Sequence, residues 1–389
     1  MVTLALAAEA PPALTRPVIV APAPREVSFG RIQGRIGDGT TRVVIRVDGV
    51  VQGDAVLSGN RFQLGLDLPA RDVTIRVTAL DASGNSASSA VTPVYGLPRA
   101  ARPHALVGSL DRTLQRRLRE LVSGYPGIAS AFVQNLRTGK GAAWNARARF
   151  QAASTVKLGI AIEVLRVLTG QPKPGSRVAR LLYRMIVYSD NAAANELEVW
   201  LGGSTSAGSA KVTATFRALG LDDTFINGGF IIGTASTTPI PLNILARPPY
   251  FSNGKYTTAW DLARIHRLIH RGAAGQGGLL GLAGSFTAAD ARYLLWVLAH
   301  VQDPGKLDRY VSGPSVSVLH KAGWISTVRH DSGIVYWQRG AFVAVVMTYN
   351  GGGAGPSSDV LAGHVAAAAL RRFSETGREL PADGRLFRL

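Results

Sequence analysis

Ser154-Thr155-Val156-Lys157 is the stretch from which the architecture of this 389-residue chain is inferred, because two other short motifs follow it in a fixed order. They are Ser189-Asp190-Asn191 and Lys321-Ala322-Gly323. The three motifs supply serine hydroxyls and lysine amines, the groups that an acyl-transfer site requires. The spacing S-x-x-K alone carries little weight, because it recurs in Ser252-Asn253-Gly254-Lys255, a Gly/Asn-rich stretch that is typical of a turn.

The context of Ser154 predicts that it opens a helix, because Leu158, Ile162 and Leu165 follow with helical spacing. Residues three apart share a helix face, so the Lys157 amine is expected beside the Ser154 hydroxyl. A lysine can activate a serine when burial and neighbouring cations lower its pKa. Partial positive charge at the helix N-terminus also suits an oxyanion near the Ser154 N–H. The alternative is that Ser154 only caps the helix and Lys157 is a solvated residue of its first turn.

The second motif precedes a segment that is expected to be helical. Ala-rich residues 192–201 follow Ser189-Asp190-Asn191, and Gly202-Gly203 ends the run. An Asp-Asn pair before a helix is also an ordinary helix cap. This motif alone therefore does not decide between a functional site and a cap.

The third motif lies in a predicted antiparallel sheet. Residues 316–321 are typical of a strand that brings Lys321 near a sheet edge, where Gly323 permits close approach of a ligand backbone. Two more strands, 333–338 and 341–348, follow with a tight turn between them. The three motifs are thus predicted to lie on helices and on the edge of one sheet.

Taken together, the motifs resemble those of the penicillin-recognising serine hydrolases, the superfamily of class A β-lactamases and penicillin-binding proteins. Residues 189–221 are similar to the segment after Ser-Asp-Asn in class A enzymes, and residues 256–263 are similar to the helix opening before that family's last strands. The likeness covers about residues 108–375. It implies an α/β (α+β) domain with an antiparallel sheet flanked by helices, plus a helical subdomain.

The same resemblance implies roles for individual residues. Ser154 would be the acylated nucleophile, and Lys157 would take or relay its proton. Ser189 would pass that proton toward the leaving nitrogen, and Lys321 would supply positive charge to the substrate carboxylate. Asn191 would bind the side-chain amide of the substrate, and the N–H groups of Ser154 and Trp324 would bind the oxyanion. Gly323 would allow close approach of the substrate. Arg329 would assist with the carboxylate, unless it is a solvated residue at the end of a strand.

Two departures from the family pattern bear on mechanism. Ala322 stands where the family has Thr or Ser, which would help to hold the substrate carboxylate. Class A enzymes also carry a loop glutamate that activates water for deacylation, but no Asp or Glu lies between Asp223 and Asp261. The look-alike of that loop, residues 239–243, has a proline in its place. Asp222 or Asp223 could supply a base, although both are expected in a turn.

Acylation groups without a visible deacylation base predict a long-lived acyl-enzyme on Ser154, formed with β-lactams or D-Ala-D-Ala-type peptides. A D-Ala-D-Ala carboxypeptidase or transpeptidase, a weak β-lactamase, and a hydrolase of other small esters and amides all fit this expectation. The non-enzymatic alternative is a catalytically weak or inactive cell-wall-binding module with the same fold.

The N-terminal part has a different pattern, with short strands separated by turn residues. Strands are expected at residues 41–48, 53–57, 61–68 and 73–80. Their spacing suggests a small β-sandwich, and the closing stretch resembles bacterial immunoglobulin-like modules; spacing, adhesion and a purely structural role all remain open. The expected division is a signal remnant and Ala/Pro linker at 1–25, the immunoglobulin-like sandwich at 26–97, a linker at 98–107 and the serine hydrolase domain at 108–389.

Composition limits the partners of the chain. The net charge is +18 and there is no Cys, so disulfides and thiolate metal sites are excluded. We expect no metal or other cofactor, because the His residues show no H-x-x-H or H-E-x-x-H arrangement. Dispersed arginines argue against nucleic acid and favour anionic cell-wall polymers. Without a predicted transmembrane segment, the chain is expected to be secreted, periplasmic or associated with the cell wall.

Overall fold

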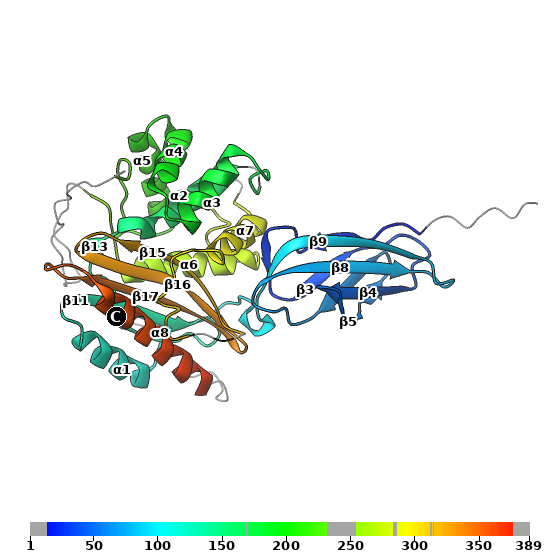
Figure 1. Cartoon of the computed structure of the whole chain (residues 1–389), viewed down its shortest axis with the longest axis horizontal. Helices are drawn as coiled ribbons and strands as arrows, with labels where there is room; N and C mark the ends of the chain where they lie inside the picture. The colour runs from blue at the N-terminus through cyan, green and yellow to red at the C-terminus, as the bar shows by residue number, and fades with distance from the viewer. Residues whose placement is uncertain are drawn as a thin grey trace, which may run out of the picture.

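A computed structural model describes residues 14–168, 170–231, 254–282, 286–311, 313 and 315–375. Two bodies lie end to end along its long axis, a narrow all-β body and a larger body of helices around a sheet (Figure 1). The segment that joins them contains one short 3-10 helix, η1 (Arg99–Ala101).

The N-terminal body consists of two sheets that enclose their own apolar core. One sheet has the order β1-β3-β7-β6 and the other β2-β9-β8-β4-β5. Buried Ile32, Ile45, Phe62, Ile75 and Val77 belong to the core of this body. The strands are β1 (Val18–Ala21), β2 (Glu26–Ser28), β3 (Arg31–Arg35), β4 (Arg42–Val47), β5 (Val50–Asp54), β6 (Val56–Ser58), β7 (Arg61–Gly65), β8 (Asp72–Leu80) and β9 (Ser86–Gly96).

Two features of this body differ from the sequence-based expectation. Strand β1 lies in the stretch for which an extended linker was expected, and it pairs with β3. The single strand expected at 53–57 is interrupted at Ala55, which is buried, and β5 and β6 on either side of it belong to different sheets. The chain crosses from one sheet to the other there, a tertiary feature without a local sequence signal. The immunoglobulin-like nature of this body stays a prediction.

The larger body is built on one sheet with the order β10-β12-β11-β17-β16-β15. All neighbouring strands in it are antiparallel except β10 and β12. Its strands are β10 (Ser109–Leu110), β11 (Ile128–Asn135), β12 (Lys140–Trp144), β15 (Ser317–Trp324), β16 (Val328–Trp337) and β17 (Gly340–Tyr349). Because β15 is an edge strand, the predicted position of Lys321 near a sheet edge is confirmed.

Helices cover both faces of this sheet (Figure 1). Helices α1 (Arg112–Ser123) and α8 (Pro356–Glu375) pack on one face, and α6 (Ala259–Ala273) packs on the other. The buried stripe of α1 contains Leu114 and Leu118, as expected, but Val122 completes it, whereas Leu121 is only partly buried. The predicted arrangement of an antiparallel sheet flanked by helices is present.

The helical subdomain packs beside the sheet and carries the second motif. It contains α2 (Lys157–Val167), α3 (Arg177–Val187), α4 (Asn191–Gly202) and α5 (Thr205–Ala218), and α7 (Ala288–Leu298) packs against α3 and α6. A two-stranded ribbon of β13 (Phe150–Gln151) and β14 (Tyr256–Thr257) lies close by. Side-chain caps explain where these helices begin; the capping residues of α3, α4, α5, α6 and α7 are Ser176, Asp190, Ser204, Thr258 and Thr287.

Buried polar contacts fix the two bodies against each other. The Glu26 side chain on β2 is 1% exposed and accepts a hydrogen bond of 2.7 Å from Arg292 Nε on α7. Asp72 on β8 accepts hydrogen bonds from Trp296 Nε1 (3.0 Å) and from His300 Nε2 (2.8 Å). The N-terminal body is therefore docked on α7 through paired charges rather than only tethered by the joining segment.

Replacing Glu26 with Gln should destabilise this docking, because Arg292 would keep its charge in a largely buried position without a carboxylate. We expect a loss of about 2 kcal/mol in the free energy of unfolding, measured by urea denaturation. Asp54→Asn, which breaks the exposed pair of Asp54 with Arg42, is the matched control and should leave that free energy unchanged within error. Equal effects of the two substitutions would contradict the assigned role of Glu26.

Candidate active site

Ser154 lies in a 3-10 turn, η2 (Ala153–Val156), which leads directly into α2. The predicted helix is therefore present, but its α-helical part begins at Lys157. A Cβ on Gly323 would lie 2.6 Å from the backbone nitrogen of Ser154, so only glycine fits there. The close approach at this glycine is thus to the chain's own backbone, and it holds the edge strand β15 against the turn that carries Ser154.

Lys157 is buried, with no exposed surface, which contradicts the alternative of a solvated first-turn lysine. Its Nζ donates hydrogen bonds to the carbonyl oxygen of Ser189 (2.5 Å) and to Oδ1 of Asn191 (2.6 Å). The pKa of Lys157 is lowered from 10.5 to about 6, mainly by burial and then by the positive charge of Lys321. The amine is therefore largely neutral at pH 7.

Lys321, on the edge strand β15 of the sheet, also contacts Ser189. Its Nζ donates hydrogen bonds to Oγ of Ser189 (2.9 Å) and to the carbonyl oxygen of Ala322 (2.8 Å). Burial lowers the pKa of Lys321 to about 8, so this amine remains mainly charged at pH 7. Ser189, which has a φ of +57°, therefore connects a neutral lysine through its carbonyl to a charged lysine through its hydroxyl.

In the second motif, Asp190 caps helix α4 and Asn191 contacts Lys157. Asp190 caps α4 by accepting a hydrogen bond of 3.0 Å from the N–H of Ala193, so the ordinary cap reading holds for Asp190. Asn191 faces the site, where its Oδ1 accepts from Lys157 and its Nδ2 donates to the carbonyl of Ile231 (2.6 Å). The motif is thus both a cap and part of the site.

Phe230 and Lys255 belong to the site although sequence reasoning missed both. Asn195 on α4 fixes the backbone of Phe230 through its N–H (2.5 Å) and its carbonyl (2.8 Å). The Phe230 ring centroid lies 4.8 Å from Nζ of Lys157 and 4.6 Å from Nζ of Lys255. Lys255 closes the second S-x-x-K sequence, whose Gly/Asn-rich composition predicted a turn; its Ser252 and residues 239–243 lie outside the described residues.

Glu198 is the third group that was missed. It has no exposed surface, and neither of its carboxyl oxygens has a hydrogen-bond partner within the described ranges. Burial raises its pKa to about 8, against the opposing charges of Lys255 and Lys157, so the carboxyl is protonated at pH 7. A signal was available, because Asn191, Asn195 and Glu198 recur on one face of an otherwise Ala-rich helix.

The remaining candidates lie at the edges of the site. Trp324, at the end of β15, is 60% exposed. Arg329 is neither free nor fully solvated, because it forms an ion pair of 2.7 Å with Asp359 on α8 and lies 6.0 Å from the Trp324 ring centroid. Asp222 and Asp223 form the expected turn, where Asp223 pairs with Arg149 at 2.6 Å.

The titration of Lys157 should respond to Lys321 in a defined direction. In the wild type we expect Lys157 to titrate near pH 6, followed by NMR of labelled lysine side chains. Lys321→Gln removes a positive charge that disfavours the Lys157 cation, so the pKa of Lys157 should rise. Lys173→Gln, at an exposed position, should leave the pKa unchanged. A Lys157 amine that titrates near 10 in the wild type would contradict the site geometry.

Several solved structures are similar to this chain in fold. PBP-A is 23% identical with a TM-score of 0.54, covering 69% of this chain and 98% of that chain. A mutant of PBP-A in an acyl-enzyme complex with penicillin G is 22% identical with a TM-score of 0.54, covering 69% of this chain and 99% of that chain. The β-lactamase from Sphaerobacter thermophilus DSM 20745 is 22% identical with a TM-score of 0.52, covering 68% and 98%.

These likenesses show the fold. A search of curated proteins found no match. The sequence model of the Beta-lactamase enzyme family matches residues 113–171 and 168–373, which is more than half of the chain and includes all three motifs. The predicted β-lactamase-like fold is thereby confirmed, and this chain belongs to the Beta-lactamase enzyme family.

Proposed function

We propose that this chain is a serine acyl hydrolase that forms an acyl-enzyme on Ser154 with β-lactams or D-Ala-D-Ala-type peptides and releases the acyl group slowly. The buried, neutral amine of Lys157, three residues after Ser154, is the observation that carries this proposal. A neutral amine has two N–H donors and one lone pair. The carbonyl of Ser189 and Oδ1 of Asn191 accept the two N–H groups, so the lone pair is left to accept a proton.

Acylation follows from this arrangement. Ser154 Oγ attacks the carbonyl carbon of the substrate while its proton passes to Lys157, directly or by relay. The N–H groups of Ser154 and Trp324 are proposed to bind the oxyanion that forms. As the bond from carbon to the leaving nitrogen breaks, Ser189 passes on to that nitrogen the proton that Lys157 took from Ser154, while Lys321 stays charged and donates a hydrogen bond to Oγ of Ser189. Asn191 would orient the substrate amide and Lys321 the substrate carboxylate. Arg329 is the weakest of the proposed contacts, because it is already paired with Asp359.

Deacylation needs a second base to activate water, and the described residues offer a poor one. Among the described residues of the loop after α5, the apolar ring of Phe230 faces Lys157. Glu198 is protonated at pH 7 and has no hydrogen bond to either lysine within the described part of the chain. These features support a persistent acyl-enzyme. A mutant of PBP-A, a protein of the same fold, has been captured as an acyl-enzyme with penicillin G.

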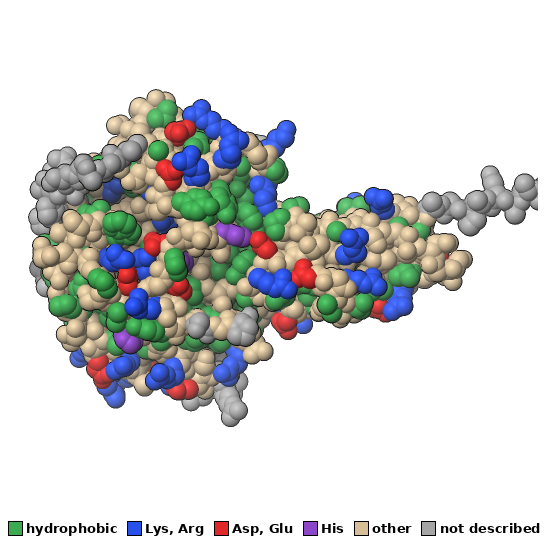
Figure 2. All heavy atoms as spheres, viewed as in Figure 1, with side chains coloured by type: hydrophobic (Ala, Val, Ile, Leu, Met, Phe, Trp, Pro, Cys, Tyr) green, Lys and Arg blue, Asp and Glu red, His purple; other side chains and the backbone are tan. Residues whose placement is uncertain are grey.

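We also propose that the protein acts outside the cytoplasm, at the cell wall, as members of this family typically do. A net charge of +18 would favour contact with anionic wall polymers. On the face shown in Figure 2, Lys and Arg side chains are scattered over both bodies with acidic side chains among them, rather than gathered into one stripe. Within the described ranges, none of the helices is both long and apolar enough to span a membrane.

Mass spectrometry of the intact protein tests the proposed nucleophile. After mixing with penicillin G we expect a covalent adduct that persists for many minutes, and Ser154→Ala should abolish it. Ser252→Ala changes the serine of the other S-x-x-K sequence and should leave the adduct intact. Loss of adduct only in Ser252→Ala would overturn the assignment, and an unmodified wild-type protein that leaves the drug intact would favour the alternative of a wall-binding module.

Phe230→Glu should supply the missing base. Asn195 holds the backbone of this residue, so a carboxylate there would lie beside Lys157, where it can accept a proton from water. We expect deacylation to accelerate about a hundredfold, measured as the decay of the penicillin G adduct. Phe230→Gln has a similar size but no charge and should not accelerate the decay. Equal decay in both variants would show that the ring, rather than the absence of a base, limits release.

A further inference from the structure

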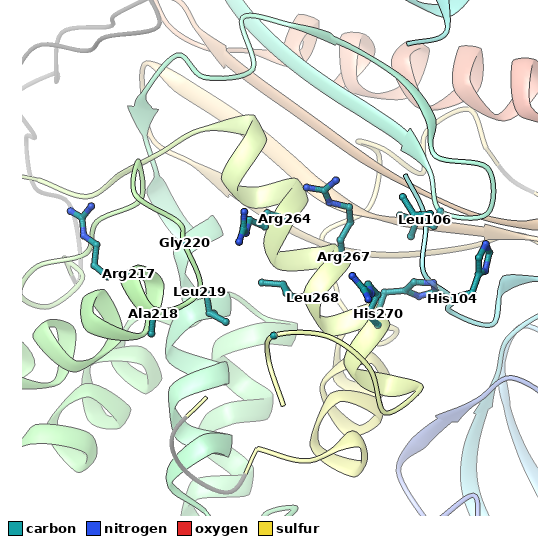
Figure 3. Close-up of a pocket in the computed structure, with 13 residues that line it drawn as sticks. His104, Leu106, Arg217, Ala218, Leu219, Gly220, Arg264, Arg267, Leu268 and His270 are labelled. Atoms are coloured by element: carbon teal, nitrogen blue, oxygen red, sulfur yellow. The ribbon is translucent and has the colours of Figure 1, made fainter. Parts of the chain in front are cut away.

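A cavity of about 580 Å³ lies between the end of α5, one face of α6 and the segment that joins the two bodies. None of the residues that line it belongs to the site around Ser154. Figure 3 shows Arg217 at the α5 end of this cavity and His104 at the end formed by the joining segment, with Arg264, Arg267 and His270 along α6 between them. The end of α5, helix α6 and the joining segment therefore each form one wall of the cavity.

The lining is strongly basic. It contains four arginines, Arg217, Arg264, Arg267 and Arg271, and no Asp or Glu. Three of the four lie on α6 at spacings of three and four residues, which brings their side chains to one face of the helix. Guanidinium groups placed this close repel one another unless a negative charge lies among them.

Of these four arginines, only Arg217 has a carboxylate partner among the described residues. Arg267 donates to Oε1 of Gln134 (2.7 Å), a neutral group, and its guanidinium lies 5.6 Å from the Phe132 ring centroid and 5.8 Å from that of Trp260. Arg217 is 3.9 Å from the exposed carboxylate of Asp222. Neither Arg264 nor Arg271 has a hydrogen-bond or ion-pair partner in the described part of the chain, and Nε of Arg271 is buried without one. Most of the cationic charge in the cavity is thus uncompensated.

Two further observations support a place for an anion. Burial, together with the charges of Arg264 and Arg271, lowers the pKa of Arg267 to about 10, which is the direction expected where a counter-charge is missing. Gly220 makes room for Arg264, because a Cβ on it would lie 2.9 Å from that guanidinium. The φ of +68° at Gly220 also favours glycine there.

We propose that this cavity binds a small ligand that carries two or more oxyanion groups, phosphate or carboxylate, held by Arg264, Arg267 and Arg271. Arginine suits this role because its planar fork pairs with both kinds of oxyanion through two parallel hydrogen bonds. The cavity is larger than one inorganic anion needs, so a ligand with several charged groups fits it better. Such a ligand would also lie against His104 and Leu106 and would join the connecting segment to α6.

Isothermal titration calorimetry at low ionic strength tests the proposal with pyrophosphate and with tricarballylate as probes. We expect saturable binding of at least one probe to the full-length wild type, and at least a tenfold weaker affinity in Arg264→Gln/Arg271→Gln. The matched control is Arg112→Gln/Arg116→Gln on α1, where both arginines are exposed. It removes the same charge and should change the affinity less than twofold. Tighter binding of pyrophosphate identifies a phosphate ligand, and tighter binding of tricarballylate identifies a carboxylate ligand.

A conservative variant separates binding from folding. Arg264→Lys/Arg271→Lys keeps the charge but loses the planar fork, so binding should weaken severalfold while the thermal unfolding midpoint stays that of the wild type. The proposal is overturned if the wild type binds neither probe at millimolar concentration, or if the α1 control loses as much affinity as the cavity variant. It is also overturned if the lysine variant binds as tightly as the wild type, because unspecific attraction to charge would then explain the result.

Discussion

The burial of two lysine amines around one serine is the constraint on which the rest of the site depends. Two charged ammonium groups in so small a buried space would be costly, and the site avoids this by keeping Lys157 neutral and Lys321 charged. Ser189 separates the two roles, since its carbonyl binds one lysine and its hydroxyl the other. Its left-handed backbone is one that serine rarely adopts, and such local strain persists where surrounding contacts fix it.

The fold supplies the contacts that keep this arrangement in place. Lys157 comes from the start of α2, Lys321 from the edge strand β15, and Ser189 from the turn before α4. The missing side chain of Gly323 lets β15 press against the backbone of Ser154, so the sheet and the helical subdomain meet at Ser154. A bulkier residue there would push β15, and Lys321 with it, away from the turn that carries Ser154.

Sequence reasoning succeeded where the signal is local. The helix that follows Ser154, the strands expected at 316–321 and 341–348, and the helix after Asn191 each follow from periodicity or capping within about ten residues. Lys255 and Phe230 could not be found in this way, because the composition around Lys255 predicts a turn and Phe230 enters the site only through its contacts with Asn195. Likewise, the two strands on either side of Ala55 are assigned to different sheets by tertiary packing alone.

The protonation states explain why a carboxyl can lie near this site and still not serve as a base. Burial raises the pKa of Glu198 to about 8 and lowers the pKa of Lys157 to about 6. It therefore favours the neutral form of both groups near pH 7. To take a proton from water, Glu198 would first have to lose its own, which places a buried negative charge among described residues that offer it no hydrogen bond. Lys157 meets no such obstacle, because its lone pair is free and its N–H groups are already bound. The same burial therefore favours the base of the proposed acylation and disfavours Glu198 as a base for deacylation.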